Sequence, residues 1–184
     1  MHPDLAAFLS ARIPVAEEDV SWDTGRLRLH VRCYLGADLP PPAYITSVRA
    51  IVLRAADVLV MRNPDATHIL PGGRREEGET LEATLHREVL EETGWAMSIR
   101  ARLGVLHFHH LTPRPPEHSY PYPDFLQVVY GAVATQHRPA ARLANDYEQA
   151  ATFRPIAEID ALATSIGPSQ ICLLAAAIEA LETT

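Results

Sequence analysis

Cysteine is scarce in this chain. Only Cys33 and Cys172 occur among its 184 residues, and they lie far apart in the sequence. Two such distant thiols give neither zinc-site spacing nor a disulfide framework, so we expect reduced cysteines and a cytoplasmic location. Long apolar runs are also missing, because the longest, ICLLAAAIEAL, contains Glu179 and is too short to cross a bilayer. We therefore expect no membrane contact.

Positive charge is limited as well. The chain has 16 Lys and Arg residues against 23 Asp and Glu residues, for a formal net charge of -7. Binding to long nucleic acid depends on clustered basic residues that neutralise phosphates, and no such stripe is present, so we expect no long nucleic-acid partner. The composition, 47% hydrophobic and 21% charged, is typical of a globular protein with a core of its own.

The first 43 residues differ in pattern from the rest. Residues 3–12 have the apolar spacing of a short amphipathic helix, and residues 26–35 alternate as a half-buried strand does. Three prolines at 40–42 then form a stiff connector, since proline disfavours helix and sheet interiors. We place a boundary here, with residues 1–43 as an N-terminal extension on or near a main domain of residues 44–184.

The main domain interleaves strands and helices. We expect two strands within 44–63, strands at 98–111, 124–135 and 151–156, helices at 80–93, 157–163 and 169–182, and a rigid proline-rich loop at 112–123. This order lacks regular strand–helix–strand alternation. It predicts an α/β fold in which helices cover the faces of a mixed sheet.

The predicted helix at 80–93 concentrates negative charge. Glu88, Glu91 and Glu92 stand at i, i+3 and i+4 and so share one face. Like charges at this spacing destabilise a helix by about 0.2–0.5 kcal/mol per pair, and Arg87 cannot neutralise all three. Mg²⁺ or Mn²⁺ takes such clustered carboxylate oxygens. A solvated acidic helix face is the alternative that this cluster alone leaves open.

The spacing around this cluster resembles the Nudix box, G-x5-E-x7-R-E-U-x-E-E-x-G-U, where U is a bulky apolar residue. The box runs here from Gly73 to Trp95, and its seven fixed positions are all matched, by Gly73, Glu79, Arg87, Glu88, Glu91, Glu92 and Gly94. The order of elements after Tyr44 is similar to that family's α/β/α sandwich. The resemblance implies hydrolysis of a diphosphate linked to another group, with Mg²⁺ or Mn²⁺ bound and water attacking phosphorus.

The resemblance also implies roles for single residues. Glu88, Glu91 and Glu92 would hold the metal together with the Gly73 position. A pair between Glu79 and Arg87 would fix the helix against the preceding loop.

The proton acceptor varies within the family, and a later loop offers Asp146 and Glu148. Glu148 lies five residues before Phe153, where the family often carries an acid. We therefore expect Glu148 to be a metal ligand or the general base. An exposed loop acid is the alternative.

Substrate contacts are predicted from residues near the box and from the strand and loop that follow it. The candidates are Arg74, Arg75, His109, Tyr120 and Tyr122. The arginines can meet phosphate and the tyrosines can stack on a base, whereas the alternatives are solvated arginines, partly buried histidines and surface tyrosines.

The predicted function is metal-dependent hydrolysis of a small diphosphate compound, either a nucleoside diphosphate derivative or a nucleoside triphosphate. The alternative is a Nudix-fold nucleotide sensor without hydrolysis, which the intact box disfavours. An isomerase of the isopentenyl diphosphate type needs a placed catalytic cysteine, and neither cysteine is near the expected position. The sequence leaves the oligomeric state open, a homodimer included.

Overall fold

The protein is described here from a computed structural model that covers residues 2–22, 25–64, 66–114, 120–143, 147–162 and 166–182. Its centre is an eight-stranded sheet in the order β1-β2-β6-β7-β3-β4-β5, with β8 paired to β4. The strands are β1 (Ala16–Trp22), β2 (Leu27–Leu35), β3 (Ile45–Arg54), β4 (Asp57–Arg62), β5 (Thr67–His68), β6 (Trp95–His110), β7 (Asp124–His137) and β8 (Ala150–Pro155).

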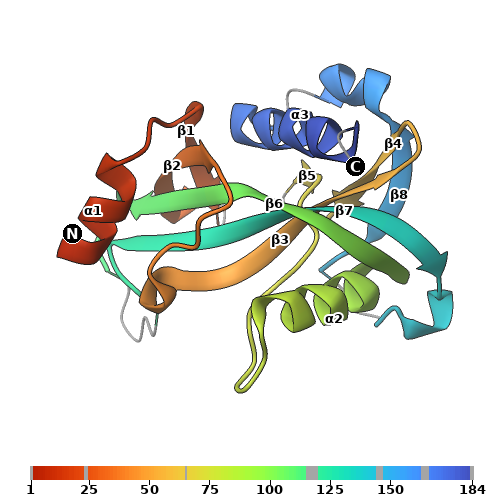
Figure 1. Ribbon diagram of the computed structural model, residues 1–184, viewed down its shortest axis with the longest axis horizontal. Helices are drawn as coiled ribbons and strands as arrows, with labels where there is room; N and C mark the ends of the chain where they lie inside the picture. Colours follow the sequence, from red (N-terminus) through yellow and green to blue (C-terminus); the bar gives the residue numbers. More distant parts are fainter. Residues whose placement is uncertain are drawn as a thin grey trace.

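Helices cover both faces of this sheet (Figure 1). The helices are α1 (Pro3–Ser10), α2 (Leu81–Thr93), α3 (Pro168–Glu182), and the short 3-10 helices η2 (Pro42–Tyr44), η3 (Pro139–Ala141) and η4 (Ile156–Leu162). The cores of α1 and α2 belong to one buried cluster, and that of α3 belongs to the cluster on the opposite face. Strands β3 and β7 run parallel and the other pairs run antiparallel. This confirms the predicted α/β sandwich with a mixed sheet.

Residues 16–35 extend the same sheet. Strands β1 and β2 form an antiparallel hairpin, and β2 pairs with β6 from Leu29↔His110 to Leu35↔Gly104. The sequence predicted a strand at β2 but missed β1, whose AEEDVSW sequence is rich in acids that disfavour strands. An edge position tolerates such charges, since they also prevent pairing with other chains.

Strand β4 separates from β3 soon after the turn. The two strands pair only at Leu53↔Val58 and Arg54↔Asp57. Beyond this point the Pro-Gly-Gly segment takes the free edge of β3, because the Val48 N–H donates to the Gly73 carbonyl and the Ala50 N–H donates to the Pro71 carbonyl, both at 3.0 Å. The split sheet therefore places this segment beside the middle of β3.

Two smaller features complete the fold. A helix was predicted at 157–163, and its described part belongs to the 3-10 helix η4, whereas residue 163 lies outside the described residues. No helix in the described ranges is both long enough and apolar enough to span a membrane. The proline-rich loop predicted at 112–123 falls in part on residues 115–119, which lie outside the described residues.

Candidate active site

The Pro-Gly-Gly segment has no room for side chains. Gly72 has a φ of 129°, which favours glycine, and a Cβ there would collide with the Val48 carbonyl. A Cβ at Gly73 would overlap the carboxylate of Glu88. The two glycines therefore let the segment lie directly against β3 on one side and against α2 on the other.

Local sequence signals set the limits of α2. The helix follows Thr80, whose hydroxyl accepts a hydrogen bond from the Ala83 N–H at 3.1 Å, and it ends at Gly94 in the left-handed conformation with φ 73°. Leu85 and Val89 are fully buried against the sheet, and each such burial contributes about 1.5–3 kcal/mol. This packing fixes the rotation of the helix, so that its glutamates lie on the flank next to the preceding loop.

Arg87 and Glu79 form a bidentate pair that joins α2 to this loop. Arg87 Nε donates to Glu79 Oε1 at 2.7 Å, and Nη2 donates to Oε2 at 2.9 Å. The hydrogen bonds from Arg87, with a further one from the Glu76 N–H, lower the pKa of Glu79 to about 2. Arg87 Nη2 also donates to the Arg74 carbonyl at 3.2 Å. The loop is thus tied to the helix through one half-buried guanidinium.

The same guanidinium contacts two further box glutamates. Arg87 Nη1 donates to Glu88 Oε1 at 2.9 Å and to Glu91 Oε2 at 3.2 Å. Both carboxylates are half-buried. Arg87 therefore reduces the repulsion between them, and Glu88 lies beside Gly73.

Glu92, like Glu88 and Glu91, is half-buried. Its Oε2 accepts a hydrogen bond from the Gly72 N–H at 2.8 Å. Burial raises the pKa of Glu92 to about 7, although Arg49 and the Gly72 N–H oppose the shift. Arg49 extends from β3 and donates to the carbonyls of Gly72 and Leu70. A half-buried acid and a half-buried base therefore lie near each other where the sheet splits.

Glu148 approaches Glu92 from the segment before β8. Its Oε1 lies 3.6 Å from His68 Nε2, and its side chain is 6% exposed. Burial would raise the pKa of Glu148, but hydrogen bonds with His68 and Asn63, together with the charge of Arg49, hold the pKa below its usual value. Its negative charge in turn contributes to the raised pKa of Glu92. The other candidate from this segment, Asp146, lies outside the described residues.

The donor atoms at this place fit a hard divalent cation. Glu88 and Glu148 add negative charge near the half-buried Glu92, and carboxylate oxygens are what Mg²⁺ and Mn²⁺ take. The Gly73 carbonyl accepts one hydrogen bond, from Val48, and keeps a second lone pair. No three His, Cys, Asp or Glu side chains within the described ranges already converge as a metal cluster. Arg87 instead occupies oxygens of Glu88 and Glu91.

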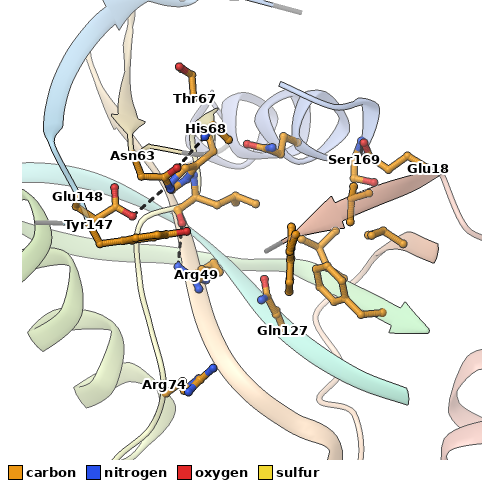
Figure 2. A pocket seen from close by; sticks show the side chains of 18 residues that line it. Glu18, Arg49, Asn63, Thr67, His68, Arg74, Gln127, Tyr147, Glu148 and Ser169 are labelled. Atoms are coloured by element: carbon orange, nitrogen blue, oxygen red, sulfur yellow. Dashed lines mark hydrogen bonds and ion pairs between the residues drawn. The ribbon is translucent and has the colours of Figure 1, made fainter. Parts of the chain in front are cut away.

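A pocket of about 510 Å³ opens on the face of the sheet that carries α3; Glu148, Arg49 and Arg74 line it, and the three box glutamates do not. Figure 2 shows His68, Tyr147 and Glu148 at one end, Glu18 and Ser169 at the other, and Arg49 and Gln127 between them. The apolar part of its wall includes Val20, Trp22, Val31, Leu70, Leu106 and Phe108. The pocket is therefore charged at the Glu148 end and largely apolar toward the β1–β2 hairpin.

The two loop arginines occupy different positions. Arg74 lines the pocket, donates to the Tyr120 hydroxyl at 2.6 Å, and lies 4.4 Å from the centre of that ring. Arg75 is exposed on the loop surface and is not among the residues that line the pocket. Arg74 and Tyr120 thus form a pair at the pocket edge.

His109 and Tyr122, both predicted to contact substrate, lie outside the lining of this pocket. Strand alternation puts His109 on the face opposite Leu106 and Phe108, where its Nδ1 lies 2.8 Å from Asp124 Oδ1. Tyr122 donates to the Thr112 carbonyl at 2.9 Å. Neither side chain is among the described residues that line the pocket.

The sequence reasoning missed Arg49, His68 and Gln127. Arg49 gives a signal in hindsight, because SVRAIVL places a charged residue at a core-facing position of an otherwise apolar strand. His68 and Gln127 carry no such signal in the sequence, since single polar residues in strands are common.

The cysteines lie apart from this chemistry. Cys33 is buried on β2, and burial raises the pKa of its thiol to about 12. Cys172 lies on α3, with its sulfur 3.9 Å from the Val15 carbonyl. Both are free thiols and neither lines the pocket. The structure therefore gives no support to chemistry that needs a catalytic cysteine.

The fold and the box define a class of protein. The NUDIX domain family matches residues 43–175, which is most of the chain, so this chain belongs to the NUDIX domain family. The matched stretch includes the Pro-Gly-Gly segment, α2 and Glu148.

Known proteins resemble this chain in fold and in part of its sequence. A NUDIX hydrolase from Nitrosomonas europaea superposes with a TM-score of 0.57 at 20% identity, covering 72% of this chain and 87% of that chain. A mutant of the Bacillus subtilis pyrophosphohydrolase BsRppH gives 0.57 at 17% identity, with 90% and 96% covered. A Bacillus subtilis (strain 168) protein named "Putative 8-oxo-dGTP diphosphatase" is 39% identical over 64 residues, which span 34% of this chain and 43% of that protein.

Proposed function

We propose that this protein hydrolyses a diphosphate linkage, in a metal-dependent reaction, in a small nucleoside diphosphate derivative or a nucleoside triphosphate. One observation carries the proposal: Arg49 and Glu148 line a 510 Å³ pocket whose charged Glu148 end faces a largely apolar end at the β1–β2 hairpin, and Glu92 lies near enough to both for their charges to affect its pKa. A phosphate chain suits the first end and a nucleoside suits the second. Membership of the NUDIX domain family supports the same reaction class.

Each charged residue has a proposed role. Glu88, Glu91, Glu92 and the Gly73 carbonyl would hold Mg²⁺ or Mn²⁺, which when bound neutralises phosphate charge and favours hydroxide over water. Arg49 presents positive charge to the phosphate chain from the pocket floor. The ion pair between Arg87 and Glu79 holds the preceding loop in a fixed position against α2.

We propose Glu148 as the acceptor of the proton from the attacking water. Its lowered pKa keeps it ionised near neutral pH, and His68 fixes its orientation. Glu148→Gln should then lower kcat by about 10²–10³ and leave Mn²⁺ affinity, measured by calorimetry, within about twofold. A parallel loss of Mn²⁺ affinity and kcat would make Glu148 a metal ligand instead.

A hydrolysis screen tests the main proposal. Nucleoside diphosphate derivatives and nucleoside triphosphates are incubated with Mg²⁺ or Mn²⁺ in ¹⁸O-labelled water, and the products are identified by mass. We expect a nucleoside monophosphate as product, with the label on a phosphate and with no turnover in chelator. Nucleotide binding without turnover under all these conditions would favour the sensor function, and cleavage of non-nucleotide diphosphates alone would overturn the nucleotide assignment.

A further inference from the structure

The wall of the pocket farthest from Glu148 comes from residues before the NUDIX match. Glu18, Val20 and Trp22 on β1 and Val31 on β2 all line it. Glu18, Val20 and Trp22 point to the same face of the sheet, because alternate residues of a strand lie on one face. Glu18 pairs with Val31 on β2, and Val31 pairs with Phe108 on β6, so the three strands present these side chains side by side. The hairpin thus adds a side to the pocket that the matched domain does not supply.

This wall presents a flat aromatic surface. The Trp22 ring lies 5.3 Å from the ring of Phe108 and 6.4 Å from that of Phe125. The two phenylalanines are buried, at 4% and 8% exposed, whereas Trp22 is 41% exposed. An indole fixed by two buried rings, with much of its own surface left open at a pocket, is suited to stacking on a flat ring of a ligand.

Polar groups next to this surface are held rigidly. Glu18 Oε1 accepts a hydrogen bond from the Ser169 N–H at 3.2 Å, and a Cβ at Gly167 would collide with the Glu18 carboxylate. The Ser169 side chain is 2% exposed, and its hydroxyl has no hydrogen-bond partner among the described residues. Both side chains line the pocket. A capping role alone explains the bond between Glu18 and the start of α3, but it does not explain the buried hydroxyl beside it.

The chemistry of these groups selects a ligand. A carboxylate accepts hydrogen bonds and cannot donate them, whereas a serine hydroxyl can donate one. A guanine edge offers two adjacent N–H donors and a carbonyl acceptor beside them, whereas an adenine edge offers a ring acceptor in place of the ring N–H. We propose, on the basis of the proposed function, that the β1–β2 hairpin builds the nucleobase subsite. Trp22 stacks on the base, and Glu18 with Ser169 reads a guanine-type edge.

The first test measures binding without hydrolysis. GDP, IDP and ADP are titrated into the protein by calorimetry in the presence of chelator. IDP lacks only the exocyclic amino group of GDP, so wild type should bind GDP about tenfold more tightly than IDP, the value of one charge-assisted hydrogen bond. Glu18→Gln should bring the GDP and IDP affinities within about twofold of each other. Glu17→Gln, one residue away on the opposite face of β1, is the matched control and should keep the wild-type ratio.

Three further variants separate stacking and recognition of the base edge from loss of the fold. Trp22→Ala should weaken the binding of all three nucleotides by about tenfold or more, and Trp22→Phe should recover most of the lost affinity. Ser169→Ala keeps the backbone N–H that Glu18 accepts, so it should lower guanine preference without changing the melting temperature.

The outcomes distinguish this inference from the proposed function. Equal binding of GDP and IDP by wild type, or unchanged affinities in both Trp22→Ala and Glu18→Gln, would overturn the nucleobase subsite whatever the hydrolysis screen shows. Guanine-selective binding with no turnover under any divalent cation would retain the subsite and remove the hydrolase proposal.

Discussion

The guanidinium of Arg87 donates two parallel hydrogen bonds to the carboxylate of Glu79, at 2.7 and 2.9 Å. Its remaining nitrogen donates to Glu88 and Glu91. One cation on α2 therefore holds the preceding loop and also offsets the charge of two carboxylates on its own helix. Such geometry needs a planar fork of donors, which lysine lacks.

Arg87→Ala should consequently lower the melting temperature and the activity together. The variant leaves Glu79, Glu88 and Glu91 without their common partner, and we expect a fall on the order of 3 °C in chelator, measured by circular dichroism. Arg87→Lys should recover only part of the loss. The control is Arg154→Ala, which breaks an exposed pair with Glu158 at 3.2 Å. Equal melting temperatures in wild type and Arg87→Ala would show that the network contributes little to stability.

Glu92→Gln should separate activity from stability. Burial of the charged carboxylate disfavours the folded protein, as its raised pKa indicates, and a neutral amide removes this cost. In chelator the variant should melt at or above the wild-type temperature. Mn²⁺ should raise the melting temperature of wild type and not of the variant, and kcat should fall by about a hundredfold or more.

The exposed Glu77 in the loop before α2 provides the control for this experiment. Glu77→Gln removes one negative charge at a surface position, so both the Mn²⁺ response and kcat should stay at wild-type values. A Glu92→Gln protein that responds to Mn²⁺ as wild type does would remove Glu92 from the proposed metal ligands.

Features set by local signals were predictable from the sequence. Thr80 and Gly94 mark the ends of α2 through capping and a left-handed turn, which depend on few neighbours. The box spacing likewise places Glu79, Arg87 and Glu88 within one loop and helix. The contact of Arg87 with Glu91 follows directly, because residues at i and i+4 meet on any helix, whereas the pair with Glu79 also depends on how the loop folds against α2.

Features that depend on tertiary packing were not predictable. The acidic strand β1 is stable only because β2 and the α3 cluster cover its inner face, with Val20 packed against that core. Arg49 becomes a site residue only because β4 leaves β3 and the glycine segment replaces it. The direction of His109 was fixed by alternation, but the side of the sheet that carries the pocket depends on where α3 lies.

The pairing of His30 should make stability depend on pH. Hydrogen bonds with Asp19 and Glu17 raise the pKa of His30 above its ordinary 6.5, and those from His30 and Arg32 lower the pKa of Glu17 below 4.5. The histidine contribution is therefore complete below pH 6.5 and is lost as pH rises through the folded pKa. The glutamate contribution is complete above pH 4.5 and is lost as pH falls.

The His30→Asn variant should reveal the pH range in which His30 stabilises the fold. Its melting temperature should lie below that of wild type by on the order of 1–2 °C near pH 5.5, and the difference should shrink toward pH 8.5. The pair is partly exposed, with Arg32 beside it and His109 opposite on β6, which keeps the effect small. His86→Asn, at an exposed position on α2, serves as control. A difference that grows with rising pH would contradict the assignment.

Gly72 and Gly78 provide a matched pair for the last prediction. Both have positive φ, 129° and 83°, but a Cβ at Gly78 meets nothing within 4 Å, whereas one at Gly72 collides with the Val48 carbonyl. Gly78→Ala should cost about 1–2 kcal/mol of unfolding free energy, from backbone strain alone. Gly72→Ala should cost more, because Val48 lies in a strand that pairs with β7 and cannot move freely.

Gly72→Ala should also abolish activity in the protein that remains folded. The Gly72 N–H donates to Glu92 and the Gly72 carbonyl accepts from Arg49. Displacing Gly72 therefore disturbs both Glu92 and Arg49. Urea denaturation and kcat measured on both variants test the difference. We expect Gly78→Ala to retain near-wild-type kcat, because that loop position is exposed and lies outside the pocket lining. Equal unfolding midpoints and equal kcat in the two variants would show that the close approach of the segment to β3 is not needed.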